Sequence, residues 1–236
     1  MRSKKCIEEI QKSFYGGEQV RDRHLFLFGG SPPFSKNLGK KFSDLSLNGK
    51  GKIAILFIIR DGWKEYMQKY TSVLEENDLK QFSYIALSSS PDHATIKELK
   101  TCTGIIISGG ETELYRKFIV DTAIGEQVIQ MYHDGVPVAG FSAGALISPE
   151  SCVISPVDNV KKEHLFLKGL GLISDCVISV HFSKWNEEEN LKLAMKKVNA
   201  PIGYGIDDEG YLFLKNERLI ENESESFCIF EKEILY

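Results

Sequence analysis

The sequence has no long apolar run, no excess of basic residues and no apolar leader, and each absence excludes a class of protein. Its longest apolar runs, such as Ile53–Ile59, are shorter than ten residues, whereas a helix that crosses a bilayer needs about 20. Lys and Arg number 29 against 33 Asp and Glu, without the basic balance or patch that is usual in nucleic-acid binders. The first residues carry positive charge, but Glu8, Glu9 and Gln11 follow where a secretory signal has its apolar core. We therefore expect a cytoplasmic protein with no membrane and no nucleic-acid partner.

Paired cysteines are also absent. The five cysteines are odd in number and widely spaced, and none forms a CxxC pair; they are Cys6, Cys102, Cys152, Cys176 and Cys228. This pattern favours reduced, mostly buried thiols over a disulfide framework or a zinc site. No cofactor or metal is implied.

What the sequence does contain is a regular alternation of two kinds of segment from His24 onward. Short apolar runs are separated by helix candidates at about 61–77, 91–101, 112–120, 124–134 and 143–148, with a further one near 186–198. The apolar runs are LFLFGG (25–30), KIAILFII (52–59), FSYIAL (82–87), GIIISGG (104–110), PVAGFS (137–142) and CVISVHF (176–182). Continuous apolar strands separated by helices predict a mostly parallel sheet that is covered on both faces. Turn signals at 208–210 and 216–217 predict short β-strands at the C-terminal end.

These elements predict a three-layer α/β sandwich. The length allows one large domain or two small ones, but no linker or internal repeat divides the chain. We expect residues 24–236 to form a single α/β domain and residues 1–23 to form an N-terminal extension.

The most informative segment runs from Pro137 to Ala145. A buried strand leads into Gly140-x-Ser142-x-Gly144 and then into a helix. This is the pattern of a nucleophile elbow, in which small flanking residues permit a strained turn that exposes the serine at the N-terminus of a helix. Developing negative charge is favoured there. The alternative is a glycine-rich turn in which Ser142 only caps the helix.

A second strand ends in Gly109-Gly110 just before a helix. Paired glycines let backbone N–H groups face a ligand, and an acyl-transfer enzyme needs two such donors for its oxyanion. The N–H groups of Gly110 and Ala143 are the candidate pair. The alternative is a tight turn, since Gly29-Gly30 shows the same dipeptide elsewhere.

A nucleophilic serine needs a base. Of the histidines at 24, 93, 133, 164 and 181, His181 stands at the carboxyl end of a predicted strand, where open α/β sheets present functional groups. The orienting carboxylate is expected from the run Asp207-Asp208-Glu209, which a plain acidic turn would also explain. The order serine, histidine, acid excludes an α/β-hydrolase, in which the histidine comes last.

Together these motifs resemble the family of serine peptidases that includes dipeptidase E and cyanophycinase, whose fold is similar to that of class I glutamine amidotransferases. The resemblance covers about residues 24–215 and rests on Gly109-Gly110-Glu111-Thr112, Gly140-Phe141-Ser142-Ala143-Gly144-Ala145, Val180-His181-Phe182 and Gly205-Ile206-Asp207-Asp208. It implies Ser142 as nucleophile, His181 as general base, Asp208 as triad acid, Gly110 and Ala143 as oxyanion donors, and Gly109, Thr112 and Lys184 as substrate-binding residues.

The sequence departs from the family after His181. Dipeptidase E carries an arginine there that reads an aspartate, but in this chain Lys184 is the one cation between Ser183 and Glu189. Arginine and lysine are not interchangeable in carboxylate recognition, so the resemblance does not carry aspartyl specificity over.

The sequence therefore predicts a serine peptidase that hydrolyses small peptides through an acyl-enzyme. Two alternatives stay open: a non-catalytic ligand-binding protein on the same fold, and an amidohydrolase or acyltransferase that acts on a non-peptide substrate. The oligomeric state is also open, and a homodimer is compatible with the sequence.

Overall fold

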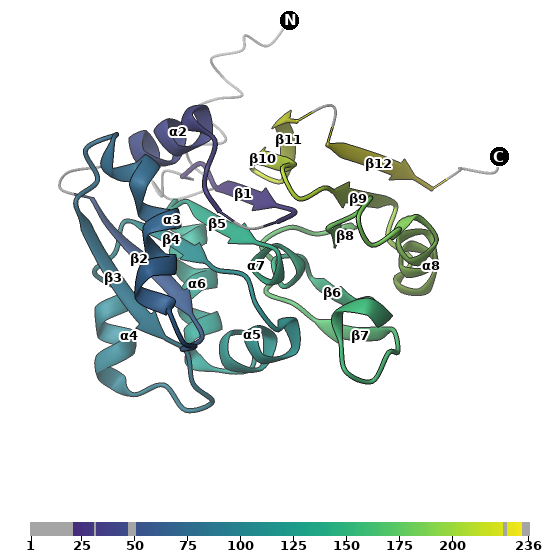
Figure 1. Ribbon diagram of the computed structural model, residues 1–236, viewed down its shortest axis with the longest axis horizontal. Coiled ribbons are helices and arrows are strands. Elements are labelled where there is room, and N and C mark those ends of the chain that lie inside the picture. The colour runs from purple at the N-terminus through teal and green to yellow at the C-terminus, as the bar shows by residue number, and fades with distance from the viewer. Residues whose placement is uncertain (1–20, 31, 47–50, 224–225, 233–236) are drawn as a thin grey trace, which may run out of the picture.

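A seven-stranded sheet forms the centre of the computed structural model, which describes residues 21–30, 32–46, 51–223 and 226–232 (Figure 1). Its strands are β1 (His24–Phe28), β2 (Lys52–Phe57), β3 (Gln81–Ala86), β4 (Gly104–Ile107), β5 (Val138–Phe141), β10 (Tyr211–Lys215) and β11 (Arg218–Asn222). They lie in the order β11-β10-β1-β5-β4-β2-β3. The five strands from β1 to β3 are parallel, and β10 and β11 extend the sheet in antiparallel fashion. The carboxyl ends of β1, β5 and β4 therefore meet at one edge of the sheet.

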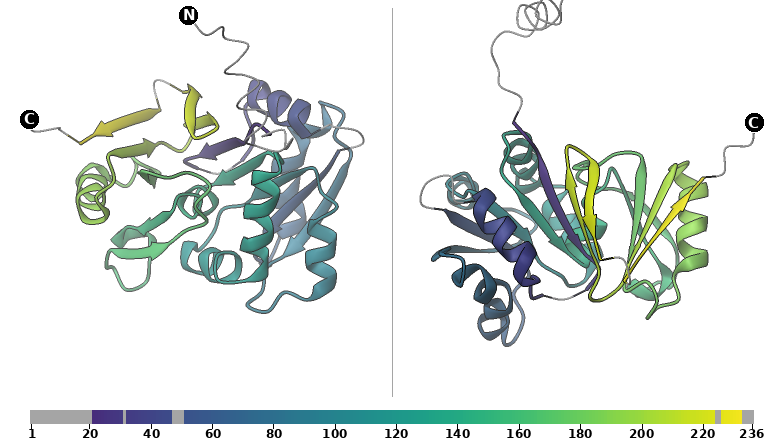
Figure 2. Two further views of the ribbon diagram at one scale, coloured as in Figure 1. Left: turned by 180° about the vertical axis from the view of Figure 1, so that it is seen from behind. Right: turned by 90° about the horizontal axis from the view of Figure 1, so that it is seen from above.

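Both faces of this sheet are covered by helices, because the central strands β1, β5, β4 and β2 are apolar on both sides. The phenylalanines of β1, Phe26 and Phe28, pack on one face with Phe42, whereas its leucines, Leu25 and Leu27, point to the other. The first face is covered by α2 (Lys36–Ser46) and α3 (Trp63–Glu75), and the second by α4 (His93–Leu99), α5 (Thr112–Ile119) and α6 (Ala123–His133) (Figure 2). The predicted three-layer α/β architecture with a mostly parallel sheet is thus confirmed.

A second, smaller layer lies at the end of the molecule opposite to β3 (Figures 1 and 2). A three-stranded sheet has the order β12-β9-β8, and β6 pairs with β7 in an antiparallel hairpin. These elements and their neighbours are α7 (Ala143–Leu146), β6 (Ser151–Ile154), the 3-10 helix η1 (Pro156–Asp158), β7 (Leu165–Lys168), β8 (Cys176–Val180), α8 (Glu188–Val198), β9 (Ile202–Ile206) and β12 (Phe227–Glu231).

The structure departs from the sequence-based expectation in three places. The run 176–182 forms β8 of the smaller sheet and does not join the central one. The helix α2 and the hairpin of β6 and β7 were not predicted: α2 follows Pro32-Pro33, which disguise its start, and the hairpin strands are only four residues long. Strands at the C-terminal end are confirmed, and two of them complete the central sheet.

Several other predictions can be compared with the described residues. Cys102, Cys152 and Cys176 are buried free thiols and Cys228 is exposed, as expected for reduced cysteines, while Cys6 lies outside the described residues. Most of the predicted N-terminal extension, residues 1–20, also lies outside them. No helix in the described part of the chain is long and apolar enough to cross a membrane.

Candidate active site

Ser142 lies on a strained turn between β5 and α7. Its backbone has φ 47° and ψ −104°, a conformation that side chains rarely adopt and that surrounding structure must enforce. The flanking glycines permit this turn, because an added Cβ would lie 2.5 Å from the Gly144 carbonyl oxygen at Gly140 and 2.4 Å from the Ile107 carbonyl oxygen at Gly144. The Ser142 N–H donates to the Phe28 carbonyl at the end of β1 over 2.9 Å. The predicted nucleophile elbow is therefore present.

His181 follows directly after β8 and faces the serine. Its Nε2 lies 3.0 Å from the Ser142 Oγ, within hydrogen-bond distance. His181 also has a positive φ, 50°, and its N–H donates to the Gly29 carbonyl over 3.1 Å. The ring of Trp185 packs on the imidazole with its centroid 4.3 Å away. The histidine side chain is only 14% exposed, so its orientation is set by the protein.

Asp208 completes the constellation from the turn after β9. One carboxylate oxygen is hydrogen-bonded to the His181 Nδ1, and the other lies 3.1 Å from the Lys184 ammonium. Burial would raise the pKa of Asp208, but the hydrogen bonds from His181 and Lys184 outweigh it and hold the pKa below its ordinary value of 3.8. The acid is thus anionic across the neutral range, and it directs the Nδ1 proton of His181 toward itself.

The neighbouring acids point elsewhere. Asp207 accepts hydrogen bonds from the backbone N–H of Ser183 at 2.6 Å and from its hydroxyl at 2.9 Å, which holds the chain after His181. Glu209 is exposed. Of the three acids that the sequence left open, Asp208 is the one that reaches the imidazole.

The loop at Gly109-Gly110 lies against the nucleophile, as expected for an oxyanion loop. An added Cβ at Gly109 would lie 3.3 Å from the Ser142 Cβ. Both polar groups of Gly109 are held by tyrosines: its N–H donates to the Tyr70 hydroxyl over 3.2 Å, and the Tyr115 hydroxyl donates to its carbonyl over 3.2 Å. The Gly109 backbone therefore has protein partners, and its contact with substrate stays a prediction.

Because the Gly109 N–H is bound by Tyr70, the N–H of Gly110 is the candidate oxyanion donor of this loop. Gly110 is exposed beside the anchored Gly109, and Ala143 is the first residue of α7, where a helical N–H has no partner within its own helix. Tyr70 and Tyr115 were not predicted to have a role at the site. A buried tyrosine hydroxyl needs a hydrogen-bond partner, which is the signal by which they could have been found.

The carboxyl end of β1 organises the triad, which the sequence did not reveal. Gly29-Gly30 was interpreted as a turn, but both glycines pack against the backbone that carries the acid. An added Cβ would lie 2.3 Å from the Asp207 carbonyl oxygen at Gly29 and 2.3 Å from the Asp208 carbonyl oxygen at Gly30. Because the Phe28 and Gly29 carbonyls also accept the backbone N–H groups of Ser142 and His181, one strand end contacts the segments that carry Ser142, His181 and Asp208.

Two of the predicted substrate-binding residues have protein partners. Thr112 is fully buried, and its hydroxyl donates to the Asp158 carboxylate over 2.7 Å. Lys184 lies beside Asp208 as described above, with a side chain that is 63% exposed. Thr112 thus links the helix after the oxyanion loop to η1, and its contact with substrate, like that of Lys184, stays a prediction.

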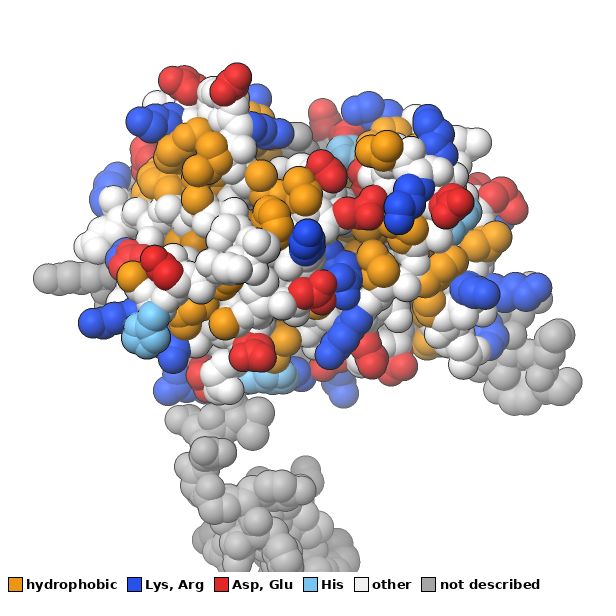
Figure 3. Space-filling model, turned by 90° about the horizontal axis from the view of Figure 1, so that it is seen from below, with side chains coloured by type: hydrophobic (Ala, Val, Ile, Leu, Met, Phe, Trp, Pro, Cys, Tyr) orange, Lys and Arg blue, Asp and Glu red, His pale blue; other side chains and the backbone are white. Residues whose placement is uncertain are grey.

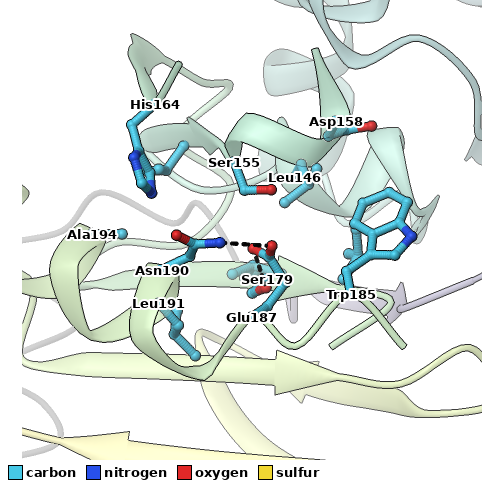
Figure 4. A pocket seen from close by; sticks show the side chains of 13 residues that line it. Leu146, Ser155, Asp158, His164, Ser179, Trp185, Glu187, Asn190, Leu191 and Ala194 are labelled. Atoms are coloured by element: carbon cyan, nitrogen blue, oxygen red, sulfur yellow. Dashed lines mark hydrogen bonds between the residues drawn. The ribbon is translucent and has the colours of Figure 1, made fainter. Parts of the chain in front are cut away.

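Two hollows adjoin these residues. One lies beside the oxyanion loop and is lined by Ile58, Arg60, Gly109, Gly110, Glu111, Leu114 and Tyr115. The other lies between η1, β8 and α8 (Figure 4), and its wall includes Trp185, whose ring packs on the His181 imidazole. Elsewhere, acidic and basic side chains are interspersed over the face shown in Figure 3. Within the described residues, no three His, Cys, Asp or Glu side chains cluster in a way that could hold a metal ion.

Comparison with known proteins agrees with this geometry. A sequence model described as peptidase family S51 matches residues 25–221. A cyanophycinase of Geminocystis herdmanii is 24% identical over 181 residues, which are 72% of this chain and 66% of that protein. A cyanophycinase of Synechococcus elongatus is 27% identical over 118 residues, 48% of this chain and 37% of its own length. The chain thus spans less than two thirds of the curated relatives that it matches.

Solved structures share the fold. A peptidase from an acI-B1 actinobacterium superposes with a TM-score of 0.65 at 17% identity, covering 93% of this chain and 91% of the other. A structure described as a peptidase E protein from Listeria monocytogenes superposes with a TM-score of 0.58 at 19% identity, covering 86% and 98%.

Proposed function

The chain belongs to peptidase family S51, and from this premise we propose that it is a serine peptidase that hydrolyses small peptides through an acyl-enzyme on Ser142. The observation that carries the proposal is the hydrogen-bonded series from the Ser142 Oγ through the His181 imidazole to the Asp208 carboxylate. Such a series lets a neutral imidazole take the hydroxyl proton while the acid stabilises the imidazolium that forms.

The first half-reaction follows from these positions. The Ser142 Oγ attacks the scissile carbonyl carbon as its proton passes to the His181 Nε2. The carbonyl oxygen gains the negative charge and is received by the N–H groups of Gly110 and Ala143. The C–N bond then breaks, and His181 returns the proton to the leaving amine.

The second half-reaction repeats the same proton transfer with water. His181 takes a proton from the water, the hydroxide attacks the acyl carbon, and the Ser142 Oγ leaves with the proton that His181 returns. The carboxylate product and the free enzyme result, so no further reactant is consumed.

The hollow beside the oxyanion loop supports a small-peptide substrate. Arg60 lines it together with Gly110, and its guanidinium stacks over the Tyr66 ring with 4.6 Å between the Cζ and the ring centroid. A guanidinium forms strong, often bidentate pairs with carboxylates. In a short peptide the C-terminal carboxylate lies only a few atoms from the scissile bond, so Arg60 is the side chain we assign to it.

The experiment is covalent labelling of the serine with a fluorophosphonate combined with hydrolysis of a dipeptide panel. Wild type is expected to be labelled and to release amino acids, and Ser142→Ala is expected to do neither while it keeps its thermal unfolding temperature. Ser148→Ala is the matched control, because this buried serine is six residues away on the same segment and only donates to the Gly144 carbonyl.

The outcomes separate the competing functions. A wild-type protein that is neither labelled nor active would be a ligand-binding protein on this fold, and the proposal would fail. A labelled protein that hydrolyses no peptide would be an amidohydrolase or acyltransferase of another substrate class. For the Arg60 assignment, Arg60→Gln is expected to raise KM for dipeptides and to have no effect on their C-terminal amides.

A further inference from the structure

A narrow cavity lies beside Trp185, the residue that packs on the His181 imidazole, and none of its lining residues lines the hollow beside the oxyanion loop (Figure 4). Its volume is about 20 Å³, and its walls come from α7, the segment between β6 and β7, β8 and the start of α8. Trp185 forms part of the wall and packs on the His181 ring at 4.3 Å. The cavity therefore adjoins the His181 imidazole through Trp185, and it is separate from the hollow that the Arg60 assignment gives to the leaving residue.

Two carboxylates line this cavity. Glu187 is only 3% exposed; it accepts a hydrogen bond from Asn190 at 2.9 Å and one from Ser179 at 3.4 Å. Asp158 accepts a hydrogen bond from Thr112 and belongs to η1 on the facing wall. Neither acid has an ion-pair partner among the residues that the structure describes.

Two further polar atoms of the wall have no partner. The Ser155 hydroxyl and the His164 Nε2 are buried without a hydrogen bond, and Figure 4 shows both side chains on the wall opposite Glu187 and Asn190. Buried polar groups are nearly always paired, so an unpaired hydroxyl and an unpaired ring nitrogen beside two carboxylates indicate a missing partner. A partner with several N–H donors would satisfy the carboxylates, and the Ser155 oxygen can accept as well.

The charges of the side chains that line the cavity indicate which kind of ligand it would bind. None of the 13 lining residues is a lysine or an arginine, and His164 is the one side chain among them that can carry a positive charge. A buried carboxylate without a cation is costly, and the donors that Glu187 meets among the described residues, Asn190 and Ser179, are neutral. A cation would do so, and a volume of about 20 Å³ suits a compact ammonium group better than a planar guanidinium.

We propose that this cavity binds an ammonium group of the residue whose carbonyl Ser142 attacks, with Glu187 and Asp158 as the residues that select it. The inference rests on the proposed function and names its substrate class: peptides with an ammonium on the acyl side of the scissile bond. The ammonium comes from the free α-amine or from a lysine-type side chain. An aspartyl side chain would meet like charge in the cavity and is selected against.

The experiment compares four dipeptides with one leaving residue: Lys-Leu, norleucyl-Leu and the N-acetyl form of each. Acetyl-norleucyl-Leu carries no ammonium on its acyl residue, and we expect its kcat/KM to be about 10–100-fold below that of the substrate with the preferred ammonium. Preference for acetyl-Lys-Leu over acetyl-norleucyl-Leu identifies the side-chain source, and preference for norleucyl-Leu over its acetyl form identifies the α-amine.

Isosteric variants assign the preference to the cavity. Glu187→Gln and Asp158→Asn are expected to raise KM for the preferred substrate and to reduce its advantage over acetyl-norleucyl-Leu to a few-fold. Glu189→Gln is the matched control, since this glutamate lies two residues further on and is 87% exposed. Fluorophosphonate labelling and thermal unfolding show in each variant that the fold and the triad persist.

The results separate this inference from the proposed function. Labelling and hydrolysis in which acetyl-norleucyl-Leu is as good a substrate as the others would overturn the inference alone, as would a preference that survives both substitutions. A protein that is neither labelled nor active would overturn both.

Discussion

Asp158 is a residue whose charge destabilises the fold, and Asp158→Asn tests this directly. Burial raises its pKa to about 6, and the hydrogen bond from Thr112 and the charge of His181 only partly oppose that effect, which Glu187 and Glu111 reinforce. Asparagine keeps the size and can still accept the hydrogen bond from Thr112, but it removes the charge. We expect the variant to be more stable than wild type at neutral pH.

The size and sign of this stability difference follow from the pKa of Asp158 in the folded and the unfolded protein. The unfolded chain releases the Asp158 proton near 3.8, whereas the folded protein retains it to about pH 6. Between these two pH values a rising pH favours the unfolded state. Above about pH 6 the destabilisation of the fold by the ionised Asp158 carboxylate is constant. A pKa difference of about 2.2 at 1.36 kcal/mol per pKa unit gives a cost of up to about 3 kcal/mol at pH 7.5 and about 1.6 kcal/mol at pH 5.

Urea unfolding of wild type and Asp158→Asn between pH 5 and pH 8 measures this difference. The gain in the free energy of unfolding is expected to grow by about 1.4 kcal/mol from pH 5 to pH 7.5 and then to level off. Asp61→Asn serves as the control, because Asp61 is an exposed acid in the turn before α3. Parallel stability curves for Asp158→Asn and wild type, or a variant less stable at pH 7.5, would refute the reasoning.

The remaining predictions concern the triad. Asp208→Asn is expected to lower kcat about 10²–10⁴-fold, because an amide favours the wrong histidine tautomer, while Glu209→Gln changes kcat little; equal loss in both would contradict the assignment. Gly30→Ala places a Cβ 2.3 Å from the Asp208 carbonyl oxygen and should lower kcat at least about 10-fold. Gly171→Ala is the comparison: its φ of 71° makes the substitution cost stability, but its added Cβ meets nothing within 4 Å, so the folded variant should retain kcat. Lys184→Met removes a cation that lowers the pKa of Asp208, so the acid limb of the kcat–pH profile should move to higher pH. That movement should shrink in high salt, and its absence at low salt would show that the ion pair does not act on the acid.

The core of the architecture could be predicted from sequence because it depends on local patterns. The β1 run alternates Phe and Leu and is apolar on both sides, which predicts a strand covered on both faces. Gly140 and Gly144 around Ser142 predict a crowded strand-to-helix turn, and the structure has one. The helix α2 could not be recognised in the same way, since the two prolines before it resemble an interruption.

Two features of the site depend on contacts between segments far apart in the chain. Gly30 accommodates the backbone of Asp208, 178 residues further on, and a Gly-Gly pair by itself does not say what approaches it. The sequence shows that Lys184 is a cation in a polar segment, but it does not show which acid lies beside it. Its place beside Asp208 follows from the turn at His181, which has φ 50°.

The sequence by itself predicted most strands of the central sheet, the turn at Ser142, and Ser142 and His181 as candidate nucleophile and base, because strand patterns and elbow glycines act on residues next to them in the chain. The tertiary structure alone decided which of three adjacent acids reaches His181, since neighbouring residues on an extended chain point in different directions. It also decided that Glu187, the first of three consecutive glutamates, is buried in the cavity that Trp185 lines, while the next two face solvent and pair with Lys192. Which of the three glutamates is buried depends on how α8 packs against β8, and the local sequence pattern does not predict that packing.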